Sequence, residues 1–190
     1  MLGLLKAGNK VWFSESDNPK RKLKYTLQIV NVGKEMVGIN THLTNKIVLE
    51  ALKEKKIESL SKYKNIKTEV KFSDNTRFDF LCDDKILLEV KNVTLNRKNN
   101  IAEFPDAVTT RGSKHLNELT DSIKLGYKPY VLFLIQIQNI NKFRIAKDID
   151  ENYYKDYIQA KKAGVKFLAY RCNLNSKEIK IEKKINIINE

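Results

Sequence analysis

The chain has 190 residues, of which 42% are hydrophobic and 31% charged, with seven glycines and three prolines. This composition excludes collagen-like, low-complexity and wholly disordered proteins. The chain is long enough to bury a hydrophobic core without the help of disulfide bonds. The net charge is +13, and a protein this basic usually binds a polyanion such as nucleic acid or anionic lipid. If the excess of lysine came only from a codon bias, the positive charge would be spread evenly over the chain. Instead, residues 1–64 carry +7 and residues 65–190 carry only +6, which favours a basic face near the N-terminus.

The two cysteines, Cys82 and Cys172, are too few for a disulfide scaffold, and neither has the Cys-x-x-Cys partner that would suggest zinc or redox chemistry. The longest apolar run, residues 130–135, is far shorter than a membrane span. The apolar stretch at Met1 is too short for a secretory signal. We therefore expect a cytoplasmic protein that does not enter a membrane, with an oligomeric state that the sequence leaves open.

The first 39 residues are predicted to form a few short strands, over residues 11–13, 26–32 and 36–39. A turn at residues 17–19 precedes a basic run made of Lys20, Arg21, Lys22 and Lys24. We expect a domain boundary near residue 39, which gives a small β domain over residues 1–39 and a second domain over residues 40–190. We interpret Trp12, between Val11 and Phe13, as a core aromatic rather than as a platform for base stacking.

The second domain is predicted to mix helices with strands. Asn40, Thr41 and Asn45 are typical N-cap residues, and the apolar spacing after them predicts a helix to about residue 55. Strands are expected over residues 66–72, 76–82, 86–95, 130–138, 165–174 and 178–188, with a polar loop at 96–100. Helices are expected over residues 108–125 and 149–163, ended by Gly126 and Gly164. This order predicts an α/β core, a mixed sheet flanked by helices, with a small β appendage at the N-terminus.

Alternation within two of the predicted strands places charged side chains on shared faces. Residues two apart in a strand point the same way, so Glu89 and Lys91 share a face, as do Arg77 and Asp79. If residues 83–85 form a three-residue hairpin loop, Asp79 lies opposite Glu89 and Arg77 lies opposite Lys91. A two-residue loop would shift the register by one position and separate them.

Two adjacent carboxylates repel each other unless a proton or a cation lies between them. Hard oxygen ligands on rigid strands suit Mg²⁺, so we predict a Mg²⁺ ion held by Asp79, Glu89 and the carbonyl oxygen of Val90. Lys91 would orient or help deprotonate a water there, which is the chemistry of phosphodiester hydrolysis. The Glu-x-Lys spacing alone is unspecific, because it occurs five times in the chain. The alternative interpretation is a cross-strand salt bridge on an exposed sheet face.

Longer motifs follow one another along nearly the whole chain. They are, in order, SDNPKRK from Ser16, RFDF from Arg77, EVKNVTL from Glu89, FPDAVT from Phe104, RG from Arg111, KHL from Lys114, EL from Glu118 and AY from Ala169. In this order and spacing the chain resembles the sugar fermentation stimulation protein A family.

The resemblance implies a small OB-like N-terminal domain and a core of the PD-(D/E)xK nuclease type, which is a restriction-endonuclease-like fold. It also implies DNA binding and a regulatory role in sugar (maltose) metabolism. The nuclease signature maps by motif onto Asp79, Glu89 and Lys91 as catalytic residues, with Glu69 as an extra acidic group. Family members begin further upstream, so either the OB-like domain is truncated here or the assigned start, Met1, is an internal methionine.

The helix predicted over residues 108–125 carries two stripes. The apolar stripe consists of Gly112, Leu116, Leu119 and Ile123, and Gly112 would let the helix approach the sheet. Arg111, His115 and Glu118 form a neighbouring stripe that would overhang the carboxylates or contact phosphate. Asp106 is expected to cap this helix. The predicted nucleic-acid contacts are Lys20, Arg21, Lys22, Lys24, Arg111, Lys114 and His115.

The composition and the resemblance together favour a DNA-binding protein of weak sequence selectivity, because the charge is lysine-rich and no recognition helix is evident. RNA as the partner is an alternative that the sequence leaves open. A working Mg²⁺-dependent nuclease on the same fold is the first rival. A sensor or enzyme for a small phosphorylated ligand is the second, although the chain lacks a glycine-rich phosphate loop.

Overall fold

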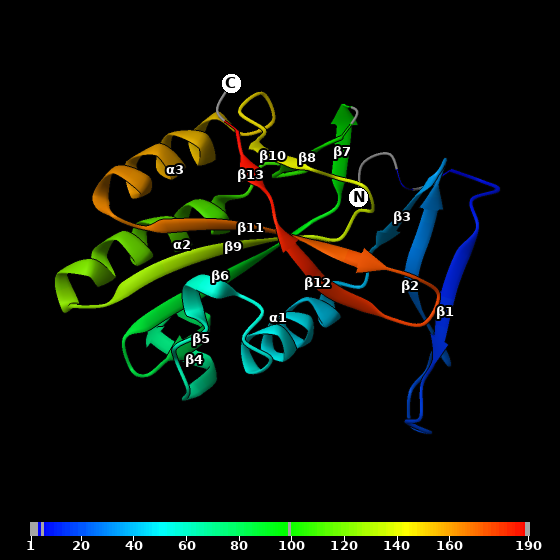
Figure 1. The fold of residues 1–190 in the computed structure, drawn as a ribbon, viewed down its shortest axis with the longest axis horizontal. Coiled ribbons are helices and arrows are strands. Elements are labelled where there is room, and N and C mark those ends of the chain that lie inside the picture. Colours follow the sequence, from blue (N-terminus) through cyan, green and yellow to red (C-terminus); the bar gives the residue numbers. More distant parts are fainter. Residues whose placement is uncertain (1–3, 5, 99, 189–190) are drawn as a thin grey trace.

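The computed structural model describes residues 4, 6–98 and 100–188, which fold into a small N-terminal sheet and a larger α/β body (Figure 1). The N-terminal sheet, called the head below, consists of three antiparallel strands, β1 (Val11–Glu15), β2 (Tyr25–Val32) and β3 (Glu35–Gly38). Trp12 is only half-buried and belongs to neither apolar core, so its interpretation as a core aromatic is wrong. A three-stranded sheet covers the ring incompletely, and Lys10 Nζ lies 5.2 Å from the ring centroid.

The body is built on a six-stranded mixed sheet, which confirms the predicted fold class. The strands lie in the order β12 (Ile179–Lys184), β11 (Lys166–Leu174), β9 (Lys128–Ile135), β6 (Ile86–Val93), β5 (Thr76–Cys82) and β4 (Ile66–Ser73). The three central strands β11, β9 and β6 are parallel, and the outer pairings are antiparallel. All of β9 except Lys128 is buried, as expected for a strand covered on both faces.

Helices cover the two faces of this sheet. The helix α1 (Thr44–Lys53) packs on one face, while α2 (Thr110–Ser122) and α3 (Glu151–Ala163) pack on the other. The two apolar cores alternate along β6, since Leu87 belongs to the α2–α3 core and Leu88 to the α1 core. Gly126 and Gly164 follow the helical segments with φ values of 87° and 114°, which confirms the two predicted stops.

A second, four-stranded sheet was not expected. Its strands lie in the order β13 (Asn186–Ile187), β10 (Lys142–Ile145), β8 (Ile101–Phe104) and β7 (Leu95–Lys98). The prediction of a polar loop over residues 96–100 is therefore wrong at residues 96–98, which belong to β7, while residue 99 lies outside the described residues and Asn100 is in a turn. The polar strand ends are stable because Arg97 and Arg144 both pair with the buried Glu103, at 2.8 and 2.6 Å. Such a long-range ion cluster leaves no local periodicity in the sequence.

Three expected cap and packing roles are wrong. Thr109, rather than Asp106, caps α2, because its hydroxyl accepts a hydrogen bond from Gly112 N. Gly112 allows α2 to approach α3 rather than the sheet, since a Cβ there would lie 3.0 Å from Tyr153 Cε2. Asn45 lies inside α1 and caps nothing, whereas Asn40 caps the preceding 3-10 turn, Thr41–Leu43. Similar short 3-10 turns occur at Glu58–Leu60 and Ile123–Leu125.

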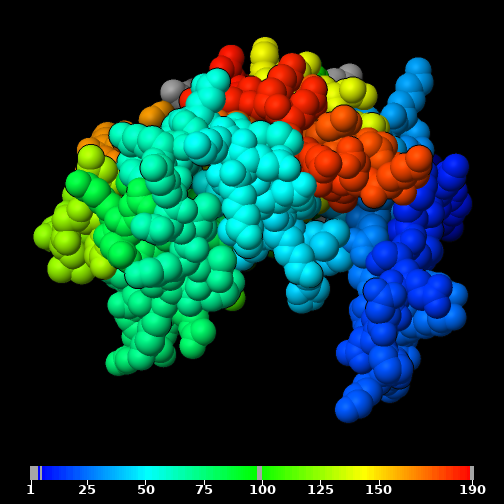
Figure 2. Space-filling view, turned by 60° about the horizontal axis from the view of Figure 1, so that its bottom comes forward, coloured from blue at the N-terminus to red at the C-terminus, as the bar shows by residue number. Residues whose placement is uncertain are grey.

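The head docks on the body through the end of β3. Gly38 N donates to Gln136 O at 2.8 Å, and Gln138 N donates to Met36 O at 3.0 Å. A Cβ on Gly38 would lie 2.5 Å from Gln136 Oε1 and 3.2 Å from Gln136 Cβ, so a larger residue there would force the Gln136 side chain to move. Figure 2 shows a hollow between the head (blue) and the β4–β5 hairpin (green), with α1 (cyan) above it.

Within the described residues, no helix combines the length and apolar character needed to cross a bilayer.

Candidate metal centre and nucleic-acid surface

The centre forms where β5 and β6 part. The hairpin has the predicted three-residue loop, and its ladder pairs Cys82 with Ile86 and Phe80 with Leu88. The ladder ends there, so the predicted pairs Asp79–Glu89 and Arg77–Lys91 do not form. Instead, Asp79 Oδ2 accepts a hydrogen bond from Val90 N at 2.7 Å. The Asp79 carboxylate thus lies in the gap between the two strands and takes the place of a backbone partner.

Asp79 is held from a second direction by α1. Asn45 Nδ2 donates to Asp79 Oδ1 at 2.7 Å. Burial raises the pKa of Asp79, and the neighbouring charge of Glu89 raises it further, to about 6. The hydrogen bonds from Val90 and Asn45 offset these effects only in part. Asp79 is therefore a carboxylate that lacks a full set of stabilising partners. Sequence reasoning missed the role of Asn45, because nothing in its pattern differs from that of a capping residue.

Glu89 is the most enclosed carboxylate of the centre, with 4% of the residue exposed. Its Oε1 accepts hydrogen bonds from Lys91 Nζ at 2.7 Å and from His115 Nδ1 at 2.5 Å. Burial opposes ionisation, but the His115 bond and the Lys91 charge outweigh it and lower the pKa of Glu89. Its Oε2 is buried without a hydrogen-bond partner. The alternative of an exposed salt bridge is therefore wrong, because α2 covers this face.

The donor set suits a hard divalent cation. In a strand the N–H and C=O of one residue point to the same side, so the Val90 carbonyl also faces the gap that holds Asp79. The carboxylates of Asp79 and Glu89, the latter with an unpartnered Oε2, and one backbone carbonyl make up an oxygen-only set. In the part of the chain that the structure describes, no three His, Cys, Asp or Glu side chains cluster as a complete protein cage. Mg²⁺ commonly binds such incomplete sets, because it keeps several waters.

Glu69 lies beside the centre rather than in it. It sits across β4 and β5 from Asp79, between the pairs Thr68–Phe80 and Val70–Phe78. Its φ of 51° is unusual for a strand residue that is not glycine, and its side chain is exposed. Asn45 Nδ2 lies 3.5 Å from Glu69 Oε1. Asn45 therefore links Glu69 to Asp79 at the rim of the centre.

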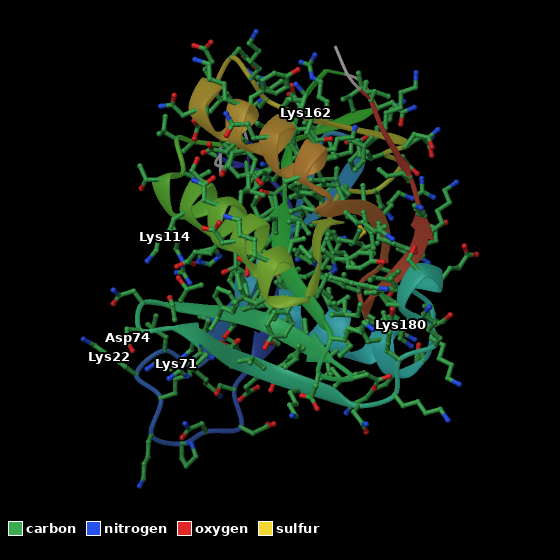
Figure 3. All side chains as sticks on the ribbon, turned by 90° about the vertical axis from the view of Figure 1, so that its left-hand side faces the viewer. Lys22, Lys71, Asp74, Lys114, Lys162 and Lys180 are labelled. Atoms are coloured by element: carbon green, nitrogen blue, oxygen red, sulfur yellow. The ribbon has the colours of Figure 1, made fainter. Side chains whose placement is uncertain are left out.

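The polar stripe of α2 divides between the interior and the surface. His115 is 5% exposed and bonds Glu89, so its predicted phosphate contact is wrong; the packing of α2 on the sheet buries the ring. Arg111 is exposed, with Nε 3.5 Å from His115 Nε2. Lys114 Nζ lies 3.5 Å from Asn75 O, at the end of the β4–β5 hairpin. In Figure 3, Lys114 projects from α2 above Lys71 and Asp74 of that hairpin.

The basic run of the head lies on the loop between β1 and β2. All four of its basic residues are exposed: Lys20, Arg21, Lys22 and Lys24. Arg21 bonds Thr26 Oγ1 at 2.5 Å and Lys24 pairs with Glu15 at 2.8 Å, while Lys22 projects from the loop in Figure 3. The head loop and the β4–β5 hairpin are the two projections that flank the hollow of Figure 2. Basic side chains thus stand on both sides of it.

Comparisons with known proteins match this architecture in both parts. The SfsA N-terminal OB domain matches residues 1–39, and the sugar fermentation stimulation protein RE domain matches residues 42–178. This chain belongs to the SfsA family. It is 58% identical over 192 residues to the sugar fermentation stimulation protein homolog of Pelagibacter ubique, covering 100% of this chain and 83% of the relative. The homolog of Brucella anthropi is 43% identical over 183 residues, covering 94% of this chain and 79% of the relative.

A solved SfsA structure has the same fold. It is described as the structure of Pyrococcus furiosus SfsA in complex with Ca²⁺. The match has a TM-score of 0.85 at 23% identity and covers 94% of this chain and 78% of the other. The restriction-endonuclease-like body with an N-terminal OB domain, expected from the sequence motifs, is therefore confirmed.

Proposed function

We propose that this SfsA-family protein binds DNA in the hollow between the head and the β4–β5 hairpin and hydrolyses it with a divalent metal ion. The observation that carries the proposal is the gap between β5 and β6, which holds a poorly compensated Asp79 beside a Glu89 whose Oε2 has no partner. Burial of the Asp79 carboxylate without enough donors costs stability, and a bound cation would offset this cost. Asp79, Glu89 and the Val90 carbonyl would hold this ion.

A divalent cation at these oxygens would neutralise phosphate charge and lower the pKa of a water. The chain's own contribution is positional. His115 and Lys91 hold Glu89 Oε1 from two sides, which leaves Oε2 free. Lys91 is the most exposed of these three side chains, at 12% against 6% for both Glu89 and His115. Its ammonium group could therefore turn toward a phosphate or a water. We assign Lys91 the orientation of the attacking water.

One further observation supports the metal. The Pyrococcus furiosus relative was solved with Ca²⁺, a hard cation with the same preference for oxygen ligands. Mg²⁺ is our choice for the reaction, because an incomplete set of protein ligands leaves room for the waters that Mg²⁺ retains. Ca²⁺ should then occupy the centre without supporting cleavage, which separates binding from hydrolysis.

DNA binding without cleavage is the second candidate. It is favoured by the contacts of Glu89 Oε1, which Lys91 and His115 already satisfy without a metal. In that case the protein would act by occupying DNA, consistent with the regulatory role in sugar metabolism that its relatives' names suggest. The lysine-rich surface predicts weak sequence selectivity in both cases, and RNA is tested alongside DNA.

The test is nicking of supercoiled DNA by the purified protein, with Mg²⁺, Ca²⁺ or a chelator. We expect cleavage in Mg²⁺ alone, and losses of about 10²–10⁴-fold for Lys91→Ala and for Asp79→Asn. Lys71→Ala is the matched control, because Glu69-Val70-Lys71 repeats the same spacing on the neighbouring strand. Wild-type protein that binds DNA but leaves it intact in Mg²⁺ would favour the second candidate. Loss of activity in Lys71→Ala but not in Lys91→Ala would place the site on β4.

A further inference from the structure

A second concave surface lies on the body and shares no residue with the metal centre. It is a cavity of about 690 Å³ at the beginnings of β9 and β11, between the end of α3 and the turn before β4. This volume falls in the range of sites that take small organic molecules. Five lysines line it, each from a different part of the chain: Lys62, Lys128, Lys161, Lys166 and Lys184.

The sheet itself leaves this space open. The strand β12 pairs with β11 only over residues 170–174. No described strand pairs with the same edge of β11 over residues 166–168, and this edge forms a wall of the cavity. The wall also includes Phe167 and Leu168, which pack into the cores on opposite faces of the sheet, so apolar groups line the cavity on both sides of the β11 edge.

Three of the lysines are held in place by aromatic rings of the same cavity. Lys62 Nζ lies 5.4 Å from the centroid of Tyr63, Lys161 Nζ 5.8 Å from that of Tyr157, and Lys166 Nζ 5.5 Å from that of Tyr130. A ring face attracts an ammonium group at such distances. The contacts reduce the freedom of these side chains before any ligand arrives, which lowers the entropic cost of binding one.

The positive charge of the cavity is not balanced locally. The lining residues all belong to the described part of the chain, and none of them is Asp or Glu. None of the five ammonium groups forms an ion pair within 4 Å with a described carboxylate, unlike Lys67, Lys71 and Lys91 on β4 and β6. Five cations around one cavity repel each other, and an anion with more than one charge would relieve this repulsion.

We propose that this cavity binds a small organic molecule that carries two or more phosphate groups. The lysines would bind the phosphates as point charges, and the apolar groups that line the cavity along the edge of β11 would cover the organic part. A DNA duplex fits this position poorly, because a cavity of about 690 Å³ has the size of a small-molecule site. The proposal does not depend on the proposed nuclease function, since the two surfaces share no residue.

The experiment is calorimetric titration of the full chain with pyrophosphate, using sulfate at equal ionic strength as the reference. We expect saturable pyrophosphate binding, weakened about tenfold by the double change Lys161→Ala and Lys166→Ala. Lys147→Ala is the matched control, because Lys147 Nζ lies 5.5 Å from the Tyr154 ring but outside the cavity; it should leave the affinity unchanged. Melting temperatures of the variants confirm that each one folds.

Two results would overturn the proposal. One is pyrophosphate binding no stronger than sulfate binding, or weakened equally by Lys147→Ala and by the double change. The other comes from a parallel titration with a short DNA duplex. If the double change lowers duplex affinity while pyrophosphate fails to bind wild type, these lysines contact the DNA backbone instead of a small ligand. Unchanged duplex affinity alongside weakened pyrophosphate binding is the result that we expect.

Discussion

Two buried acidic groups in this protein have opposite surroundings. Glu103, in the four-stranded sheet, is bonded by the guanidinium groups of both Arg97 and Arg144, and Arg97 also binds Asp148. Burial opposes its ionisation, but the two arginines outweigh that effect and lower its pKa. Asp79 receives only an amide and a backbone N–H, and its pKa rises to about 6. The first arrangement is complete without any ligand, whereas the second gains stability from an added cation.

The comparison separates buried carboxylates that have all their hydrogen-bond and ion-pair partners from those that lack some of them. A buried carboxylate whose oxygens are all paired cannot be removed without leaving its partners uncompensated, and it has no oxygen left to bind a cation. A buried carboxylate whose charge is poorly compensated, like that of Asp79, costs stability, and such groups concentrate at functional sites. Removing charge should therefore harm the Glu103 cluster and relieve the metal-free Asp79 centre.

The largest effect is expected at Glu103. Glu103→Gln removes the buried negative charge that Arg97 and Arg144 share, and should lower the free energy of unfolding by about 3–5 kcal/mol. Urea denaturation measures this change. Glu182→Gln is the control, because Glu182 pairs with Arg171 at a partly exposed position and should cost about 1 kcal/mol or less. Equal losses in the two variants would show that the Glu103 cluster is no more than a surface ion pair.

Asp79→Asn should act in the opposite direction and depend on pH. Because the folded pKa of about 6 exceeds the ordinary value of 3.8, ionisation of Asp79 destabilises the fold progressively as pH rises from about 4 to above 6. The variant should match wild type below about pH 4 and exceed its free energy of unfolding by up to about 3 kcal/mol above pH 7. Urea denaturation in a chelator measures both proteins across this range.

Asp121→Asn provides the reference for that pH series, since the Asp121 side chain is 66% exposed and pairs only with Lys124. Its stability difference from wild type should stay within about 0.5 kcal/mol at every pH. An Asp79→Asn variant that is less stable than wild type at pH 8 without metal would contradict the account of Asp79 as a poorly compensated charge.

The smallest effect concerns the head loop. Lys22→Ala should weaken binding to all DNA sequences alike and reduce the slope of log affinity against log salt by about one, because one phosphate contact is lost. Fluorescence anisotropy at several salt concentrations measures that slope. Lys162→Ala is the control, since Lys162 lies on α3 at the end of the molecule away from Lys22 (Figure 3). An unchanged slope in Lys22→Ala would remove the head loop from the binding surface.

The sequence predicted the hairpin that carries the centre, because loop length sets the register of paired strands. Asp83 and Asp84 adopt positive φ in that loop, a conformation that aspartate tolerates better than most residues. The prediction failed beyond Phe80, where the Asp79 side chain replaces a backbone partner and ends the ladder. Local alternation contains no information about such a substitution.

The rest of the centre depends on contacts between distant segments. The apolar stripe of α2 was predicted correctly, with Leu116 and Leu119 fully buried, but the same periodicity left open whether His115 overhangs the carboxylates or contacts phosphate. Only the docking of α2 over β6 buries His115 against Glu89, 26 positions away in the chain. The second sheet was missed for the same reason, since Arg144 lies 41 positions from Glu103. Pairs separated so widely leave no pattern within one segment.

The central claim is that Asp79 and Glu89 hold a divalent metal, and thermal unfolding with added Mg²⁺ tests it most directly. At a hundredfold excess over its dissociation constant, a bound ion should stabilise wild type by about 2.7 kcal/mol and raise its melting temperature by about 5–10 °C. Asp79→Asn should lose this shift, while Asp74→Asn, which changes an exposed carboxylate, should keep it. A wild-type melting temperature indifferent to millimolar Mg²⁺ and Mn²⁺, or a shift that persists in Asp79→Asn, would contradict the claim.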